Sequence, residues 1–230
     1  LDNAQSLFGD PSGDDFFFKR LDDITSAFSA SADDPSSSLL RSQALSTVQD
    51  FLGDTSRINA QITQLGKTVD AQANADVARI NDLLAQIDRL NSDVSRAKLA
   101  NADSSGSENI QSGLIVELSS LMNVQASQRA NGGVLIRSTE GMSLAGEGAA
   151  VIKYEQSPTA NGFLTVTSAN SGGQASPLYV SSGELKGLLD LRNTKLPGLS
   201  DQLGEFVSRT AQQLNAAHNA STASPPPTTL

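Results

Sequence analysis

The chain has 230 residues, which is enough for one substantial domain or two modest ones. Hydrophobic residues make up 38% of it and aromatic residues only 4%, a composition that suits long, thin helix packing better than a thick globular core. The net charge of -9 disfavours nucleic acid and anionic membrane as partners, because an acidic surface repels phosphate. The absence of cysteine excludes disulfides and cysteine-based metal sites, and the sequence contains no apolar run long enough to predict a transmembrane helix.

Turn-forming residues dominate residues 1–14, which we expect to form a loop. Apolar residues then recur at helical spacing, which predicts a helix over residues 15–30. The segment Ser31–Pro35 ends that helix. Asp34 is the expected N-cap of the next helix, with Pro35 at its first position, where the missing N–H costs nothing.

A long helix is predicted from Pro35 to Ala100, a stretch without further proline in which apolar residues recur every seven positions. The a sites are Leu45, Leu52, Asn59, Gly66, Ala73, Ile80, Ile87 and Val94, and the d sites are Val48, Thr55, Ile62, Val69, Asp76, Leu83, Leu90 and Ala97. A continuous helix of about 60 residues would be roughly 90 Å long, and this length predicts a rod. Gly53 and Gly66 leave its continuity open.

Three residues interrupt this heptad pattern: Asn59, Gly66 and Asp76. Two interpretations stay open, since such residues either specify register or a partner, or face solvent where the seam is only partly covered. Apolar neighbours also change from one side of the seam to the other along its length. This change predicts a drift or stutter near Ala71–Asp76.

The middle of the chain changes from helical to strand-like patterning. A turn at Asn101–Ser107 and a helix over residues 108–122 are followed by short segments that glycine-containing turns separate. Strands are expected at residues 124–127, 134–137, 143–144, 149–155, 163–167 and 178–180. Their polar alternation predicts a small antiparallel β unit with one solvated face.

Leucines at helical spacing return after Gly183, lead to Pro197 and continue beyond it to about Asn219. This terminal helix should pack against the long one, because an isolated amphipathic helix is unstable. The predicted fold class is α+β: an elongated helical rod or bundle with long coiled-coil-like helices and an inserted small antiparallel β domain. The predicted domains are a discontinuous helical rod (1–122 and 183–220), a β domain (123–182) and a disordered tail or linker (221–230).

Residues able to do chemistry are few. The single histidine, His218, stands at a helix end, where packing or a hydrogen bond to a terminal carbonyl is favoured over general-base chemistry. Solvated charge or capping is favoured over acid–base or calcium chemistry for the adjacent aspartates at 14–15, 22–23 and 33–34. Gly132–Gly133 and Gly172–Gly173 lack the lysine of a phosphate loop and are predicted turns. We therefore expect no catalytic, cofactor-binding or metal site, no cofactor and no enzyme activity.

Several segments resemble the family of flagellar hook-associated protein 1. The clearest is Gly183–Arg192, similar to the family's Gly-x-Leu-x-Gly-Leu-Leu-x-Phe-Arg opening, although Leu191 stands where Phe is usual. A leucine-spaced helix follows, with Asn215–His218 similar to the family's Asn-x-x-His ending. Ile80–Asn91 is similar to an Ile-Asn-x-Leu-x-x-Gln-Ile-x-x-Leu-Asn segment.

Two further segments resemble the family in the same order along the chain. Phe16–Phe18 with the later Asp33–Pro35 is similar to a short helix and an Asn-Pro-x-Asp turn, and Val116–Ser119 leads into strands as in the family. Ile110–Ile115 departs from the usual Leu-Leu-Asp-Gln-Arg-Asp. The resemblance covers most of residues 15–220.

The resemblance implies a structural subunit of the bacterial flagellum that joins hook to filament and assembles as a ring on the hook tip, outside the cell. The implied partners are the flagellar hook protein, the next hook-associated protein and further copies of the chain. Type III export is implied, with an export chaperone that docks on a C-terminal region outside this chain. Because the chain begins with Leu1 and not Met, and lacks the family's terminal polymerisation segments, we expect a core fragment.

Two other identities stay open. Flagellin and other hook-associated proteins share a helical rod with inserted β domains, and a free coiled-coil module would dimerise through residues 45–97. Arg192 also has two interpretations, a structural salt bridge or a contact between subunits.

Overall fold

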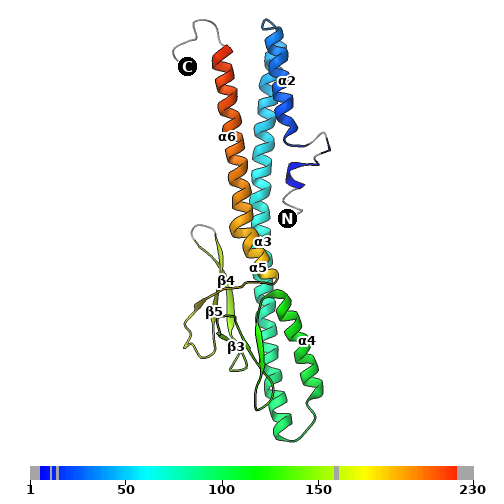
Figure 1. Ribbon diagram of the computed structural model, residues 1–230, viewed down its shortest axis with the longest axis vertical. Helices are drawn as coiled ribbons and strands as arrows, with labels where there is room; N and C mark the ends of the chain where they lie inside the picture. Colours follow the sequence, from blue (N-terminus) through cyan, green and yellow to red (C-terminus); the bar gives the residue numbers. More distant parts are fainter. Residues whose placement is uncertain (1–5, 11, 14–15, 158–160, 222–230) are drawn as a thin grey trace. The chain divides into compact units, whose positions relative to one another are not determined.

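A single uninterrupted helix, α3 (Ser38–Leu99), is the longest element of the fold (Figure 1). Its 62 residues pass through Gly53 and Gly66 without a break, so the helix is continuous where the sequence left this open. The predicted N-cap is wrong. The Asp34 side chain instead accepts the nearby Ser36 N–H at 3.2 Å and forms a local turn. The helix begins at Ser38, and the side chain that accepts an N–H of its first turn is Ser37 Oγ, 3.3 Å from the Leu40 nitrogen.

The computed structural model describes residues 6–10, 12–13, 16–157 and 161–221, with side chains for 7–10, 12–13, 16–157 and 161–217. The chain forms two compact units, residues 1–66 with 196–230 and residues 67–195. The predicted β domain, 123–182, lies within the second unit, and its independence as a domain, like that of the helical rod, stays a prediction. Of the predicted tail, only Ser221 lies among the described residues, as the last residue of α6.

In the first unit, α2 (Lys19–Asp33) and α6 (Leu196–Ser221) flank the N-terminal half of α3, and a short 3-10 turn, η1 (Ser6–Phe8), precedes them (Figure 1). Ser200 Oγ of α6 donates to Asn59 Oδ1 of α3 at 3.3 Å. Together with the aromatic contacts below, this bond confirms that the terminal helix packs against the long helix.

Aromatic side chains form the centre of the first unit. Phe51 of α3 stacks on Phe17 with ring centroids 5.4 Å apart and meets Phe206 of α6 at 6.1 Å. The buried positions of this part of α3 include Ala44, Phe51 and Ile58, each one residue before a predicted a site. The predicted seam is therefore wrong by one position in this half of the helix, because the core is built around Phe51 and not around its neighbour Leu52.

The buried row of α3 changes phase between Ile58 and Val69. Ile58 precedes a predicted a site by one residue, whereas Ile62 and Val69 are predicted d sites. Within these eleven positions the buried row therefore moves into the predicted heptad register. The stutter therefore lies before the predicted Ala71–Asp76. All predicted a sites from Gly66 to Val94 are buried within the chain itself, so this stretch offers no free seam for the coiled-coil dimer considered above.

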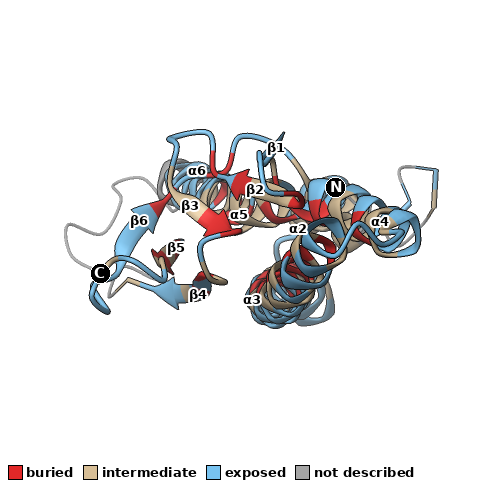
Figure 2. Ribbon diagram, turned by 90° about the horizontal axis from the view of Figure 1, so that it is seen from below, coloured by how far each residue is buried: buried red, intermediate tan, exposed pale blue. Residues whose placement is uncertain are grey.

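In the second unit, α4 (Ser105–Leu121) runs back along α3, and Figure 2 shows the strands on the other side of that helix. Arg79 Nε lies 2.6 Å from Glu117 Oε1, and Lys98 Nζ lies 3.1 Å from Glu108 Oε1. These two ion pairs at opposite ends of α4 fix its antiparallel orientation. The helix predicted over residues 108–122 thus begins three residues earlier.

The β segment forms two three-stranded antiparallel sheets. The first contains β1 (Gln125–Gln128), β2 (Val134–Arg137) and β3 (Ser143–Ala145), and the second contains β4 (Val151–Gln156), β5 (Gly162–Thr167) and β6 (Ser176–Leu178). Antiparallel pairing is confirmed, but the predicted single β unit is divided. The division follows from positive φ angles at Gly146 (107°) and Gly148 (98°), which turn the chain between the sheets. The N–H of Ala150, the residue before β4, donates to the carbonyl of Leu144 in β3 at 2.8 Å.

One hydrophobic core joins α3, α4 and both sheets of this unit. Its fully buried side chains include Ile80, Leu83 and Ile87 of α3, Leu118 of α4 and Ile136 of β2. The fold class is therefore α+β, with long helices and small antiparallel sheets, as predicted.

The C-terminal helical segment is continuous but contains a wider turn. α5 (Glu184–Asp190) leads into a π-helical turn, η2 (Leu191–Lys195), and then into α6. Pro197 gives a physical reason, since in a regular α-helix its ring would clash with the carbonyl of Asn193, and a wider turn relieves that clash. Gly183 precedes α5 with φ at +93°, and a Cβ there would lie 2.6 Å from the Leu121 carbonyl oxygen, so only glycine fits.

Candidate functional site: an assembly surface and the asparagine anchors

Three leucines of α3 are exposed in the first unit: Leu39 at 66%, Leu45 at 63% and Leu52 at 47%. Leu45 and Leu52 are predicted a positions, seven residues apart, so they share one face of the helix. A single exposed leucine is ordinary, but a heptad pair on one face is typical of a helix that pairs with another helix. We call Leu45 and Leu52 the leucine row; Leu39, six residues before Leu45, lies on another face of the helix.

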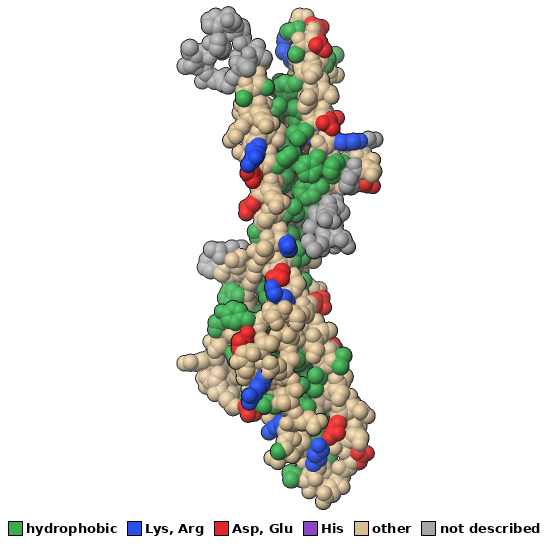
Figure 3. Space-filling model, in the orientation of Figure 1, with side chains coloured by type: hydrophobic (Ala, Val, Ile, Leu, Met, Phe, Trp, Pro, Cys, Tyr) green, Lys and Arg blue, Asp and Glu red, His purple; other side chains and the backbone are tan. Residues whose placement is uncertain are grey.

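A second apolar surface lies in the same unit. Figure 3 shows hydrophobic side chains gathered in a band between α2 and α6. Phe18, the residue before α2, is 41% exposed, and its ring centroid lies 5.7 Å from that of Phe8 and 5.2 Å from that of Phe206 of α6. We call Phe8, Phe18 and Phe206 the aromatic band. Both surfaces are suited to contacts with other proteins, because each presents apolar side chains at the exterior.

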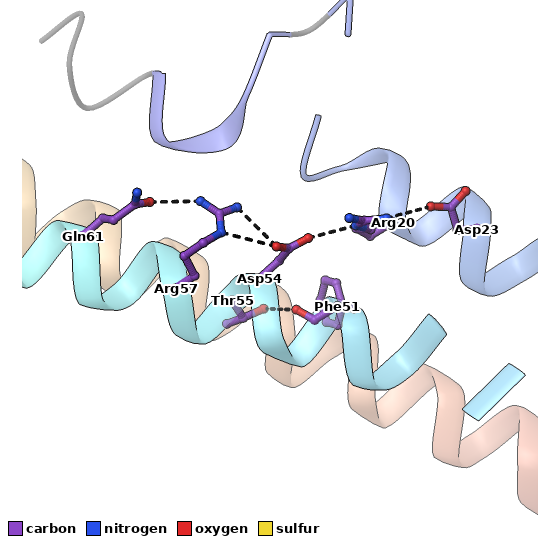
Figure 4. Close-up of polar contacts among 7 residues, drawn as sticks. All are labelled: Arg20, Asp23, Phe51, Asp54, Thr55, Arg57 and Gln61. Carbon is purple, nitrogen blue, oxygen red and sulfur yellow. Dashed lines mark hydrogen bonds and ion pairs between the residues drawn. The ribbon is translucent and has the colours of Figure 1, made fainter. Parts of the chain in front are cut away.

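Polar contacts of Asp54 fasten α2 to α3 beside the aromatic core (Figure 4). Asp54 accepts the Arg20 Nε–H at 2.9 Å and hydrogen bonds from Arg57, which also donates to Gln61 at 3.1 Å. Burial disfavours the charged form of Asp54, but the hydrogen bonds from the two arginines outweigh it and hold its pKa below the usual value. Arg20 also pairs with Asp23 at 3.5 Å, so one of the adjacent aspartates has a surface role as expected.

Two asparagines of α3 bind the strands with both atoms of the side-chain amide. Asn81 Nδ2 donates to the Ile152 carbonyl at 2.8 Å, and its Oδ1 accepts the Ile152 N–H at 2.8 Å. Asn91 makes the same pair with Val134, at 2.8 Å and 2.6 Å. Each amide therefore offers the strand the donor and acceptor that a neighbouring strand would offer.

Asp88 adds a third contact on the same face of α3. Its Oδ1 accepts the N–H groups of Gly146 at 2.9 Å and Gly148 at 3.2 Å, at the turns between the two sheets. The segment Ile80–Asn91 was singled out by its resemblance, but no role was assigned to its polar residues. The spacing of Asn81, Asp88 and Asn91 by seven and three residues was the available signal, since it places them on one face.

Arg192 and Asn193 hold the π-helical turn in place. Arg192 Nε donates to Asp70 Oδ1 of α3 at 2.8 Å, and the two side chains are only 18% and 15% exposed. This confirms the interpretation of Arg192 as a structural salt bridge. Asn193 pairs with both backbone groups of Gly162 in β5, at 2.7 Å each.

Tyr154 of β4 donates its hydroxyl hydrogen bond to the same Asp70 carboxylate. Burial, then the hydrogen bond to Asp70, raises the pKa of Tyr154 to about 12, above the ordinary value near 10. The neutral phenol is thus favoured in the folded state. Its contribution to stability is complete below about pH 10 and declines as the pH rises toward 12.

We expect Tyr154→Phe to remove that part of the alkaline decline. The measurement is the free energy of unfolding in urea between pH 9 and pH 12, taken as the difference between wild type and variant. That difference should shrink as the pH rises, because the wild-type phenol then ionises and loses its advantage. A constant difference across this range would contradict the assignment.

The residues that interrupt the heptad differ in their environments. Asn59 is exposed, as the solvent interpretation predicts, whereas Gly66 and Asp76 are buried, so that interpretation is wrong for these two. Asp76 is 4% exposed and accepts a hydrogen bond from the Gln72 amide at 2.8 Å. The phase change of the buried row accounts for this difference, since it turns the later a and d sites inward.

The prediction that the chain has no catalytic, cofactor or metal site involves several residues, and the structure describes the side chains of only some of them. His218 and the pair Asp14–Asp15 lie outside the described side chains. Among the described residues, no group of three or more histidine, aspartate or glutamate side chains is placed to hold a metal ion. Gly132–Gly133 and Gly172–Gly173 occupy turns with positive φ, as predicted. The expectation of no catalytic or cofactor site stays a prediction.

The described helices were also compared with the requirements of a bilayer. None within the described ranges combines the length and apolar composition of a membrane span.

Comparison with known structures finds proteins with a similar fold. The chain is similar to the solved structure described as the flagellar hook junction protein FlgK from Burkholderia pseudomallei, with a TM-score of 0.70 and 21% sequence identity. The similarity covers 82% of this chain but only 34% of that protein, so the chain spans about a third of its length. A comparison with curated proteins gave no match.

Comparison with protein families agrees with this fold. Residues 1–224 match the family described as the flagellar hook-associated protein FlgK helical domain, which is nearly the whole chain. The family is one of structural components of the bacterial flagellum and not of enzymes. The exposed apolar surfaces and the asparagine-anchored sheets therefore belong to a scaffold, and the chain is a member of the family of FlgK helical domains of flagellar hook-associated proteins.

Proposed function

We propose that this protein is a structural subunit that joins the flagellar hook to the filament and assembles as a ring at the hook tip, outside the cell. Membership of the FlgK helical-domain family and the likeness to a protein described as a hook junction protein support the proposal. The observation that carries the assembly step is the leucine row, an apolar heptad pair left exposed on α3. The proposed partners are the hook protein, the next hook-associated protein and further copies of the chain.

The proposed mechanism is geometric and involves no chemical step. Contacts through the first unit would hold neighbouring subunits together, because burying the leucines removes apolar surface from water. In the second unit, Asn81, Asp88 and Asn91 tie the sheets to α3 by directional hydrogen bonds. A force applied to the sheets would therefore pass to the helix without slippage between strands and helix.

Deletion of the full-length gene in a flagellated host should leave hooks without filaments. Complementation with the gene carrying both Leu45→Asp and Leu52→Asp should permit export but fail to restore filaments, because two carboxylates disfavour burial of the row. Electron microscopy of the cells and immunoblotting of the medium measure the two outcomes.

The matched control is Leu99→Asp, since Leu99 is 83% exposed in the second unit. It adds a charge to an exposed leucine outside the row and should restore filaments. Filaments that persist after deletion would refute the junction function. If the row variant restores filaments, the junction function stands, but the leucine row is not needed for it.

A further inference from the structure

The two apolar surfaces of the first unit lie on different faces of α3. The leucine row has Leu45 and Leu52, whereas the core beside the aromatic band uses Ala44 and Phe51. Neighbouring helical residues are about 100° apart around the axis, so the row faces well away from the band. A unit with two distinct apolar surfaces is suited to head-to-tail contacts, which generate rings, and not to a two-fold contact of one surface with itself.

The two surfaces differ in how they are built. The row presents separate leucine side chains from a single helix, and three of the neighbours on that face, Ser38, Gln49 and Ser56, are exposed and uncharged. The band lies between two helices, with the rings of Phe8 and Phe206 on either side of Phe18. Two leucines projecting from one helix and three rings contributed by other segments are therefore different apolar surfaces that can pack against each other and bury apolar area.

The charges are complementary. Arg41 is exposed four residues before Leu45 on the face of the row. The band has exposed acidic residues on both flanking helices, Asp22 on α2 and Asp201 on α6, and Figure 3 shows acidic side chains on both sides of it; Glu205 is already paired with Arg209 of its own helix. A row-to-band contact therefore pairs unlike charges at the rim.

We propose that the occupant of the aromatic band is the leucine row of a second copy of this chain, in a head-to-tail contact. The inference rests on the proposed function only for its setting in a ring, since the contact itself is a property of two chains in solution. It assigns one side of the subunit interface to α3 and the other to η1, the residue before α2, and α6. Each copy then uses its row on one neighbour and its band on the other.

Crosslinking between introduced cysteines tests this contact, because the chain has no cysteine of its own. Leu45→Cys and Phe18→Cys variants of the chain are mixed at high concentration and treated with a short bismaleimide. We expect the mixed pair to crosslink at least ten times more than either variant alone. A chain carrying both substitutions should form a ladder of multimers, since each copy then reacts on both sides.

The control variant is Leu99→Cys, which is more exposed than Leu45 and should crosslink to Phe18→Cys only at the background level. Preferential Leu45–Leu45 crosslinking would overturn the proposal in favour of a two-fold contact. Mixed crosslinking no stronger than that of the control would overturn it as well. Circular dichroism of each variant before the reaction establishes that it is folded, and Leu52→Cys replaces Leu45→Cys if it is not.

A second measurement uses variants that block one surface each. Leu45→Asp with Leu52→Asp blocks the row, and Phe18→Asp blocks the band, so neither variant should self-associate. Mixed together they should form a one-to-one complex and nothing larger in sedimentation velocity, because one intact row meets one intact band. A mixture that stays monomeric while the wild type associates would overturn the head-to-tail contact.

The outcomes separate this inference from the proposed function. If the double-cysteine chain forms a crosslinked ladder but the deletion strain keeps its filaments, the row-to-band contact stands and the junction function is refuted. Loss of filaments in the deletion strain without row-to-band crosslinks would leave the function standing and refute this contact.

Discussion

Replacing Asn91 with alanine should lower the free energy of unfolding of the second unit by about 3–5 kcal/mol. Asn91 is 2% exposed and bonds to the N–H and C=O of Val134 and to the side-chain amide of Gln111, which lies 2.8 Å from its Oδ1. Alanine would leave these three groups without that partner. Each buried polar group that loses its partner costs about 1–3 kcal/mol, and Gln111 keeps only a long bond to the Ile87 carbonyl at 3.4 Å.

Urea unfolding followed by far-ultraviolet circular dichroism measures this loss. The control is Asn109→Ala on the exposed face of α4, which we expect to change stability by no more than about 0.5 kcal/mol. A loss below about 1 kcal/mol for Asn91→Ala would mean that water satisfies Val134 equally well, and that the asparagine is not an anchor.

Replacing Phe51 with alanine should lower the free energy of unfolding of the first unit by about 3–5 kcal/mol, the usual cost of removing a buried ring. Phe51 is 2% exposed and contacts both Phe17 and Phe206, so its loss leaves a cavity between α3, α6 and the turn before α2. Among its described residues, the other large buried side chains of the first unit are Phe17, Ile24, Ile58, Ile62, Leu196 and Leu203. A loss of this size is therefore a large share of its stability.

Amide hydrogen exchange distinguishes the two units in this experiment. Protection should fall in α2, α6 and the N-terminal half of α3, while β2 and β5 keep theirs, because their core does not contain Phe51. Leu39→Ala serves as the control, since its exposed side chain should contribute under about 0.5 kcal/mol. Equal loss of protection in both units would show that they unfold as one.

The two variants separate two means of holding the fold together. In the first unit, apolar rings hold helices that carry their own backbone hydrogen bonds. In the second unit, short strands require partners for backbone groups that their neighbours do not reach, and asparagine side chains of α3 and η2 supply them. The anchors are therefore needed wherever a short strand meets a helix instead of another strand.

Local patterns in the sequence were sufficient to predict most elements. The heptad spacing predicted one long helix, the Gly132–Gly133 turn separated the two predicted strands that became β1 and β2, and the return of leucines after Gly183 predicted the terminal helix. Each of these signals depends on neighbours within a few residues, namely periodicity, turn chemistry and the lack of proline. The fold class followed from their order along the chain.

Tertiary structure alone decided which face of α3 is buried in each unit. Leu45 and Leu52 satisfy the heptad as well as Ala44 and Phe51 do, and only the contacts of Phe51 with Phe17 and Phe206 select the second pair. The same choice leaves the leucine row exposed, so the candidate assembly surface exists because the core formed on the other face. Periodicity cannot make this choice, since both rows repeat every seven residues.

The asparagine anchors were likewise beyond local patterns. Asn91 meets a strand residue 43 positions later, and Asn81 meets one 71 positions later, so no window of neighbouring residues contains both partners. From sequence alone, an asparagine on a helix is expected to be solvated, because the strand that it binds comes from a distant part of the chain. The sequence by itself determined the elements and their order, while contacts between distant residues decided which side chains became core, anchor or exposed surface.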